Sequence, residues 1–190
     1  SKAKKNDALK YAAEFLLKNK GKLLDANTID MELASQKDLQ DSFVDRLELN
    51  EKRIDSMISG LDKVINLDDP VGQTDQAHTS PSGFEVSKMR VPLGVIGIIY
   101  ESRPNVTADA SALCLKSGNA CILRGGSEAA NSNAVIEECM QNGLDKASLP
   151  KYSIQLIKNQ DRRLVGEMIK REEDIDLLIP RGGKSLIKVV

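Results

Sequence analysis

The amino-acid sequence predicts an α/β fold: a doubly wound parallel sheet with N-terminal helices and a two-stranded β arm. Three observations lead to this prediction. Apolar side chains recur at helical spacing through residues 1–70. A nearly unbroken apolar run over residues 91–100 suits a strand that is covered on both faces. After this run, apolar strands alternate with helical segments, which calls for right-handed crossovers in a parallel sheet.

The composition of the 190-residue chain excludes several classes of protein. Hydrophobic residues make up 41% and charged residues 29%, which fits a folded core and excludes a disordered chain. Lys and Arg (27) balance Asp and Glu (28), and only 3% of residues are aromatic, so nucleic-acid binding is not expected. No apolar run has membrane-spanning length, and three cysteines without paired spacing fit reduced thiols. We therefore expect a cytoplasmic protein that binds neither nucleic acid nor membrane.

Four amphipathic helices are predicted in residues 1–70. The fourth has the clearest signals, because Asn50 is a good N-cap, and Leu49 and Ile54 occupy the positions of a hydrophobic staple. Its end is marked by the Asp-Asp-Pro sequence of residues 68–70. The four predicted spans are 5–18, 23–34, 39–47 and 51–65.

A two-stranded arm is predicted over residues 71–90. Residues 73–78 and 84–89 are polar and extended, and the Ser-Pro-Ser-Gly sequence of residues 80–83 forms a turn between them. Because so polar a hairpin is marginal alone, we expect it to pair with another sheet or another subunit. A surface excursion of its own domain is the alternative. His78, the one histidine, has no ligand-type neighbours here, so we expect it to be exposed, without function and without a metal site.

Residues 91–190 are predicted to form successive βαβ units. The predicted strands are 91–100, 120–123, 153–157 and 175–179, and the helices that follow them are 105–117, 127–141, 162–169 and 184–190. Ser127 and Asp161 are the expected N-caps of two of these helices, whereas Gly118 and residues 142–143 are the expected ends. Because the last predicted helix stops after about two turns, we expect the chain to be part of a longer protein.

Two glycine-rich turns each follow a strand and precede a helix, and we expect them on neighbouring strands. Glycine lets the backbone approach a ligand, a helix N-terminus presents free N–H groups, and arginine can fork onto phosphate. Tight turns without a ligand are the alternative. A P-loop is excluded, because Leu178 stands where that motif needs glycine. The residues expected to meet a phosphorylated ligand are Arg124, Gly125, Gly126, Ser127, Arg181, Gly182 and Gly183.

The three cysteines are not expected to act as nucleophiles. Cys114 and Cys139 fall on apolar helix faces, and Cys121 falls in a buried strand. Buried cysteine usually behaves as a small hydrophobic residue with an unreactive thiol. A Ser-His-Asp system would need His78, which is poorly placed for it.

Four segments together resemble one family. They are VPLGVIGIIYESRPNVT (91–107), LCLKSGNACILRGGSEAANSN (113–133), IDLLIPRGG (175–183) and DRLELNEKRIDSMISGLDKVINLDDPVG (45–72). The combination of YESRPNV with ILRGG and IPRGG is similar to the γ-glutamyl phosphate reductases, also called glutamate-5-semialdehyde dehydrogenases, of the aldehyde dehydrogenase superfamily. The resemblance runs from about residue 45 to the C-terminus, with a weaker helical match before it.

The resemblance implies an activity and a division of labour. The family reduces L-glutamyl 5-phosphate with NADPH to L-glutamate 5-semialdehyde and phosphate, in proline biosynthesis. A Cys thiolate attacks the acyl phosphate, and it lies in a later domain. Residues 91–190 would then be a Rossmann-like NADP-binding part, truncated before the catalytic domain, so we expect this chain alone to be inactive. The resemblance also implies homo-oligomerisation through the 71–90 arm, and channelling with glutamate 5-kinase.

The resemblance assigns roles to single residues. Arg124, in the turn 124–127, falls where the superfamily places a basic residue on the adenosine ribose or its phosphate, and residues 181–183 fall where the second cofactor loop meets the pyrophosphate. Asn105 falls near an Asn that helps to hold the oxyanion, and the N-cap of the following helix is its alternative role. Arg103 is expected to meet the phosphate or carboxylate of the substrate. NADPH and NADH both stay open, because no contact to a 2′-phosphate is readable.

Two other functions fit the same residues. The chain could be a non-catalytic cofactor-binding or assembly module, with the arm over residues 71–90 as its working surface. Within the family, it could be the reductase part of a bifunctional pyrroline-5-carboxylate synthase.

Overall fold

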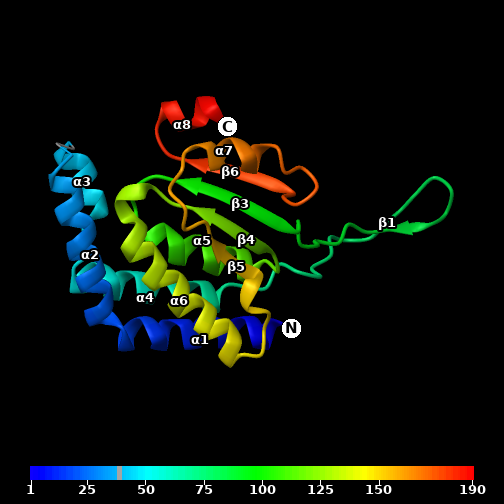
Figure 1. Cartoon of the computed structure of the whole chain (residues 1–190). Coiled ribbons are helices and arrows are strands. Elements are labelled where there is room, and N and C mark those ends of the chain that lie inside the picture. The colour runs from blue at the N-terminus through cyan, green and yellow to red at the C-terminus, as the bar shows by residue number, and fades with distance from the viewer. Residues whose placement is uncertain (38–39) are drawn as a thin grey trace.

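A parallel β-sheet forms the centre of the structure, a computed structural model that describes residues 1–37 and 40–190. In the described chain the strand order is β5 (Ile154–Leu156), β4 (Ala120–Arg124), β3 (Val95–Tyr100), β6 (Leu177–Arg181), and every pair is parallel. Figure 1 shows this sheet between helices that lie on both of its sides. The prediction of a doubly wound parallel sheet is therefore confirmed.

Helices cover both faces of the sheet. They are α1 (Lys2–Lys18), α2 (Lys20–Ser35), α3 (Asp41–Leu47), α4 (Glu51–Asn66), α5 (Asn105–Lys116), α6 (Ala130–Lys146), α7 (Arg163–Ile169) and α8 (Lys184–Val189). Ile96 and Ile98 of β3 share one apolar core with α1, α4, α5 and α6. Gly97 points the other way, where a Cβ would lie 3.3 Å from Cε of Met168 in α7. Successive residues of β3 thus face opposite sides of the sheet, and each side packs against a layer of helices.

The N-terminal helices follow the predicted pattern closely. Asn50 caps α4 as predicted, because its Oδ1 accepts a hydrogen bond from the Arg53 amide at 2.9 Å. The predicted third helix starts at Leu39, which lies outside the described residues, and α3 begins at Asp41. No helix of the described residues is both long enough and apolar enough to cross a membrane.

The predicted end of the helix at residues 142–143 is wrong. The helix α6 continues to Lys146, and Gly143 lies inside it. A Cβ at this glycine would lie 2.5 Å from the carbonyl oxygen of Ala8 and 2.7 Å from the amide nitrogen of Ala12. Gly143 therefore lies where α1 and α6 approach closely, and tertiary packing overrides its preference for helix ends.

The predicted N-cap Ser127 is also wrong, because a different residue caps the helix. Ser127 begins a short 3₁₀ turn before α6. The carboxylate of Asp30, which lies in α2 and is 1% exposed, accepts hydrogen bonds from the backbone amides of Asn131 (3.1 Å) and Ser132 (2.8 Å). A carboxylate at a helix N-terminus satisfies free N–H groups and opposes the helix dipole. Tertiary structure thus supplies the cap.

Strand boundaries differ from the prediction, most of all in β3 and β6. The run 91–100 becomes a strand only at Val95, because Gly94 adopts a left-handed φ of 124° and the carboxylate of Asp176 accepts the Val95 amide at 2.7 Å. Pro180 and Arg181, predicted as a turn, belong to β6. Proline is tolerated there because β6 is an edge strand of the described sheet.

The arm over residues 71–90 is a hairpin, as predicted. β1 (His78–Thr79) pairs antiparallel with β2 (Glu85–Val86), and an isolated bridge joins Thr74 to Met89. In Figure 1 the arm projects away from the rest of the molecule. Phe84 is 71% exposed, and His78 is exposed as predicted. Neither strand pairs with the central sheet, so the partner of the arm stays a prediction.

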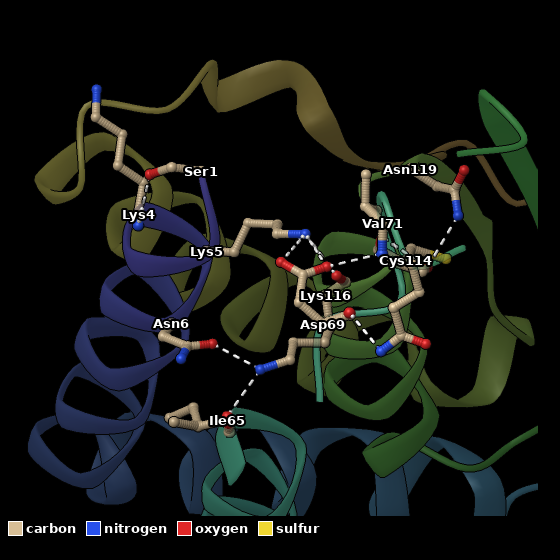
Figure 2. Close-up of polar contacts among 12 residues, drawn as sticks. Ser1, Lys4, Lys5, Asn6, Ile65, Asp69, Val71, Cys114, Lys116 and Asn119 are labelled. Carbon is tan, nitrogen blue, oxygen red and sulfur yellow. Dashed lines mark hydrogen bonds and ion pairs between the residues drawn. The ribbon is translucent and has the colours of Figure 1, made fainter. Parts of the chain in front are cut away.

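A buried charged cluster anchors the root of the arm to the helices (Figure 2). Lys5 Nζ of α1 donates to Asp69 Oδ1 and to the carbonyl oxygen of Lys116, both at 2.8 Å. Lys116 Nζ donates to the carbonyl oxygen of Ile65 at 2.8 Å, and Asp69 Oδ1 accepts the amide of Val71 at 3.1 Å. The cluster therefore links α1, the end of α4, the end of α5 and the first residue of the arm.

The cluster predicts a pH dependence of stability. Burial alone would raise the pKa of Asp69, but hydrogen bonds from Lys5 and the Val71 amide outweigh it and hold this pKa below its ordinary value of 3.8. A depressed carboxyl pKa stabilises the fold above the ordinary value, and the stabilisation is lost as pH falls through the folded pKa. We expect Asp69→Asn to lower the urea midpoint near neutral pH, with a difference from wild type that shrinks below pH 3.8. A constant difference at all pH values would contradict this.

Candidate functional site

The carboxyl ends of β3, β4 and β6 bring the predicted site residues to one edge of the sheet. The chain leaves β3 towards β4 on one side and reaches β6 on the other, so the topological switch lies beside β3. Ligands of open α/β sheets bind at such a switch. The expectation that the two glycine turns lie on neighbouring strands is wrong, because β3 separates β4 from β6. The two turns instead flank the loop over residues 101–104.

The end of β3 is held by a buried hydroxyl ladder. Thr107 Oγ1 donates to Asn133 Oδ1 at 2.8 Å, and the hydroxyl of Tyr100 lies 2.7 Å from Thr107 Oγ1. Burial raises the pKa of Tyr100, so its phenol stays protonated. The ladder fixes β3 against α5 and α6 and so positions the loop that carries Arg103 and leads into α5 at Asn105.

The turn after β4 is organised by the buried side chain of Arg124. This residue is 5% exposed, and its guanidinium donates to the carbonyl oxygen and to Oε1 of Gln160, both at 3.0 Å, and to the carbonyl oxygen of Gly125. Burial lowers its pKa. Its Nε is buried without a hydrogen-bond partner in the described chain. In this structure the buried Arg124 side chain therefore holds the segment around residue 160.

Packing explains the glycines of this turn. A Cβ on Gly125 would collide with the amide of Asn133, and one on Gly126 would lie 3.2 Å from Ser102 Oγ. Ser127 Oγ donates to Glu128 at 3.0 Å. The tight-turn interpretation is thus sufficient for the glycine pair, and phosphate contact by this turn stays a prediction.

The turn after β6 faces a cavity. Gly182 packs against Glu101, where a Cβ would lie 2.6 Å from Cδ, and the Gly183 amide donates to Glu101 Oε1 at 2.9 Å. Together with Arg181, these glycines line a cavity of about 300 Å³. Its other lining residues are Phe43, Arg46, Tyr100, Glu101, Ser102 and Arg103.

A second cavity, of about 440 Å³, adjoins the first, and the two share Arg46 and Arg103. Asn105 lines it and is the first residue of α5; Pro104 is the N-cap, so the N-cap role for Asn105 is wrong. Asn105 Nδ2 donates to Asp109 Oδ2 at 3.0 Å. An amide nitrogen carries two hydrogens, so one remains for a ligand.

The sequence did not point to the helical corner between α3 and α4 as part of this site. Asn27 of α2, which is 2% exposed, holds the corner: its Nδ2 donates to the carbonyl oxygen of Leu47 at 2.9 Å, and its Oδ1 accepts the amide of Leu49 at 2.7 Å. This fixes Arg46 beside the strand ends. Local spacing carries no signal for this position, because the contact joins helices to a loop that follows much later in the chain.

The cysteines lie away from this edge of the sheet. Cys114, Cys121 and Cys139 are all buried, as expected. Burial raises the pKa of Cys139 to about 11, so that thiol stays protonated at neutral pH. All three cysteines belong to the apolar core.

Comparison with known proteins gives a consistent relationship. No protein-family model matches the chain. The γ-glutamyl phosphate reductase of Thermoanaerobacter sp. strain X514 is 52% identical over 186 residues, which are 98% of this chain and 45% of that protein. The chain is related over its whole length to γ-glutamyl phosphate reductase. The enzyme of Clostridium beijerinckii is 50% identical over 190 residues.

Solved structures support the same relationship. The crystal structure of γ-glutamyl phosphate reductase from Thermotoga maritima has a TM-score of 0.95 and 46% identity, over 100% of this chain and 46% of that one. The yeast structure, from Saccharomyces cerevisiae, has a TM-score of 0.91 and 32% identity. A probable aldehyde dehydrogenase from Listeria monocytogenes (TM-score 0.72, 13% identity) shares the fold. The chain spans about half the length of the reductases it matches.

Proposed function

We propose that this chain is the cofactor-binding and substrate-facing part of a cytoplasmic γ-glutamyl phosphate reductase, in proline biosynthesis. The reaction would be NADPH-dependent reduction of L-glutamyl 5-phosphate to L-glutamate 5-semialdehyde and phosphate. The observation that carries the proposal is the paired cavity at the ends of β3 and β6, which is lined by four arginines, in a chain this similar to reductases. A glutamate 5-kinase would supply the acyl phosphate, directly by channelling.

The residues at this edge fit a dinucleotide. Arg181 forms no hydrogen bond or ion pair through its guanidinium in the described chain, and it lines the smaller cavity beside two glycines. A free arginine next to closely approachable backbone suits a pyrophosphate. Bound NADPH supplies hydride. Arg181, Gly182 and Gly183 would hold its phosphates, while Arg124 would shape the adenosine side by fixing Gln160. We propose that Gly125, Gly126 and Ser127 border that side.

The chain's own residues would orient the substrate. Arg103 is exposed and lines both cavities, where it can hold the substrate's phosphate or carboxylate. Asn105 can donate its remaining amide hydrogen to an oxygen on which negative charge develops. Because the chain spans about half of the related reductases, we propose that the nucleophilic Cys comes from outside it and that the chain alone is inactive.

Arg181→Ala is expected to weaken NADPH binding about tenfold, because it removes a charge-assisted contact to phosphate. Titration of the purified chain, followed by NADPH fluorescence, measures this. Arg171→Ala is the matched control, because Arg171 follows α7, does not line the smaller cavity and pairs with Asp174 at 3.4 Å. Equal affinities of the two variants would contradict the proposal. Arg124→Ala is expected to lower binding and thermal stability together.

Assembly is a second function, favoured by the arm over residues 71–90. Phe84 and Met89 are 71% and 61% exposed on it, and its short strands leave backbone groups free to pair. We propose that the arm joins copies of the chain into a homo-oligomer. Sedimentation velocity of the chain with and without residues 74–89 tests this, and an unchanged mass would exclude it.

A further inference from the structure

The two adjoining cavities differ in charge. The smaller one is lined by Arg46, Arg103 and Arg181 and by one carboxylate, that of Glu101. Glu101 already accepts the amide of Gly183 at 2.9 Å. The smaller cavity is therefore net cationic, and it suits a phosphate group.

The larger cavity has a wall of mixed charge. Within it, Arg53 is already committed: its Nη2 lies 2.6 Å from Asp45 Oδ1, and its Nη1 lies 3.5 Å from Glu48 Oε2. Arg53 also donates to the carbonyl oxygen of Glu48 at 2.9 Å. Arg53, Asp45 and Glu48 thus pair with one another at the α3–α4 corner. The other charged residues of the cavity are left to contact a ligand.

Arg46, Arg103 and Asp109 are the charged residues of the larger cavity that remain, and Asp109 is the one carboxylate among them. In the described chain, the Arg46 guanidinium makes no hydrogen bond or ion pair, although it lines both cavities. Asp109 Oδ2 accepts one bond, from Asn105, and Oδ1 accepts none. Burial raises the pKa of Asp109, against the influence of Asn105 and Arg181. A half-buried carboxylate with a free oxygen gains from a cationic partner.

We propose that the larger cavity recognises the α-amino acid end of the substrate, with Arg46 on the α-carboxylate and Asp109 on the α-ammonium. The phosphate end then extends into the cationic cavity. This inference rests on the proposed function and deepens it. An α-amino acid needs a fork-shaped cation and a carboxylate side by side, whereas a phosphate needs cations only.

The size and support of the cavity agree with this role. Its volume of about 440 Å³ lies within the roughly 300–1,000 Å³ typical of small-molecule sites. Arg46 precedes Leu47, which is fully buried and bonded to Asn27. The N-terminal helices would thus select the substrate as well as cover the sheet.

Three stable phosphonates test the inference, by calorimetric titration of the chain. The first mimics L-glutamyl 5-phosphate, with methylene groups in place of the carbonyl group and of the oxygen that bridges carbon and phosphorus. The second lacks only the α-carboxylate, and the third lacks only the α-amino group. We expect Arg46→Ala to weaken the first compound about tenfold or more and to leave the second unchanged. We expect Asp109→Asn to weaken the first compound and to leave the third unchanged.

Two further measurements make the result decisive. Arg46→Lys keeps the charge but loses the fork, so it should bind the first compound with intermediate affinity. Circular dichroism checks that each variant is folded. Equal weakening of all three compounds by Arg46→Ala, or no weakening, overturns the inference, as does a wild-type chain that binds NADPH but no phosphonate. A folded wild-type chain that binds neither NADPH nor phosphonate contradicts the proposed function itself.

Discussion

Replacement of Asp30 by alanine is expected to destabilise the fold by about 4 kcal/mol. Its carboxylate is 1% exposed and accepts four hydrogen bonds, from the backbone and side chain of both Asn131 and Ser132, at 2.7 to 3.1 Å. Alanine leaves buried N–H groups at the start of α6 without an acceptor, and it removes the favourable charge at the helix N-terminus. Urea denaturation measures the loss, which corresponds to a fall in melting temperature of roughly 10 °C.

The control for this substitution lies in α2, the helix that carries Asp30. Asp25 also lies in α2 but is exposed, and it forms no hydrogen bond or ion pair through its side chain in the described residues. Asp25→Ala is expected to change stability by less than about 0.5 kcal/mol. Similar losses for both variants would show that helix propensity or net charge, and not the cap on α6, sets the effect.

Replacement of Gly143 by alanine is expected to destabilise the fold by about 3 kcal/mol, although alanine is the better helix former. The new methyl group would lie 2.5 Å from the carbonyl oxygen of Ala8 and 2.7 Å from the amide of Ala12. Both atoms belong to the backbone of α1, so the helices must separate. The midpoint of chemical denaturation measures the change.

Gly166→Ala is the matched substitution, with the opposite expected sign. Gly166 also lies inside a helix, α7, but a Cβ there meets no atom within 4 Å. We expect stabilisation by up to about 1 kcal/mol from propensity alone. If Gly143→Ala were also stabilising, the close approach of α1 and α6 in the structure would be incorrect.

Local patterns in the sequence were sufficient to predict the elements. The apolar run that ends at Tyr100 and the periodic residues after Asn50 identify a strand and a helix without any tertiary information. Gly118 was correctly predicted at the end of a helix, where its φ of 78° is left-handed. Such predictions succeed because backbone geometry and solvent exposure act within a few neighbouring residues.

Long-range contacts were not predictable in the same way. The local sequence predicts a helix end at Gly143. The residue lies inside a helix instead, because Ala8 and Ala12, which are distant in the chain, pack on it. The local sequence predicts that Arg124 is free to bind phosphate, but its guanidinium donates a hydrogen bond to Gln160. Arg46 gives no local signal, and only the fold places it beside Arg103.

The most direct test of the site is amide chemical-shift mapping of the chain with NADPH. The account predicts shifts at the carboxyl edge of the sheet, at Ser102, Gly126, Gly182 and Gly183. An apolar cavity of about 590 Å³ includes Val95 and Ala120, the first residues of β3 and β4, and is the competing location. Shifts confined to the residues of that cavity, with the glycine turns unchanged, would contradict binding at the carboxyl edge.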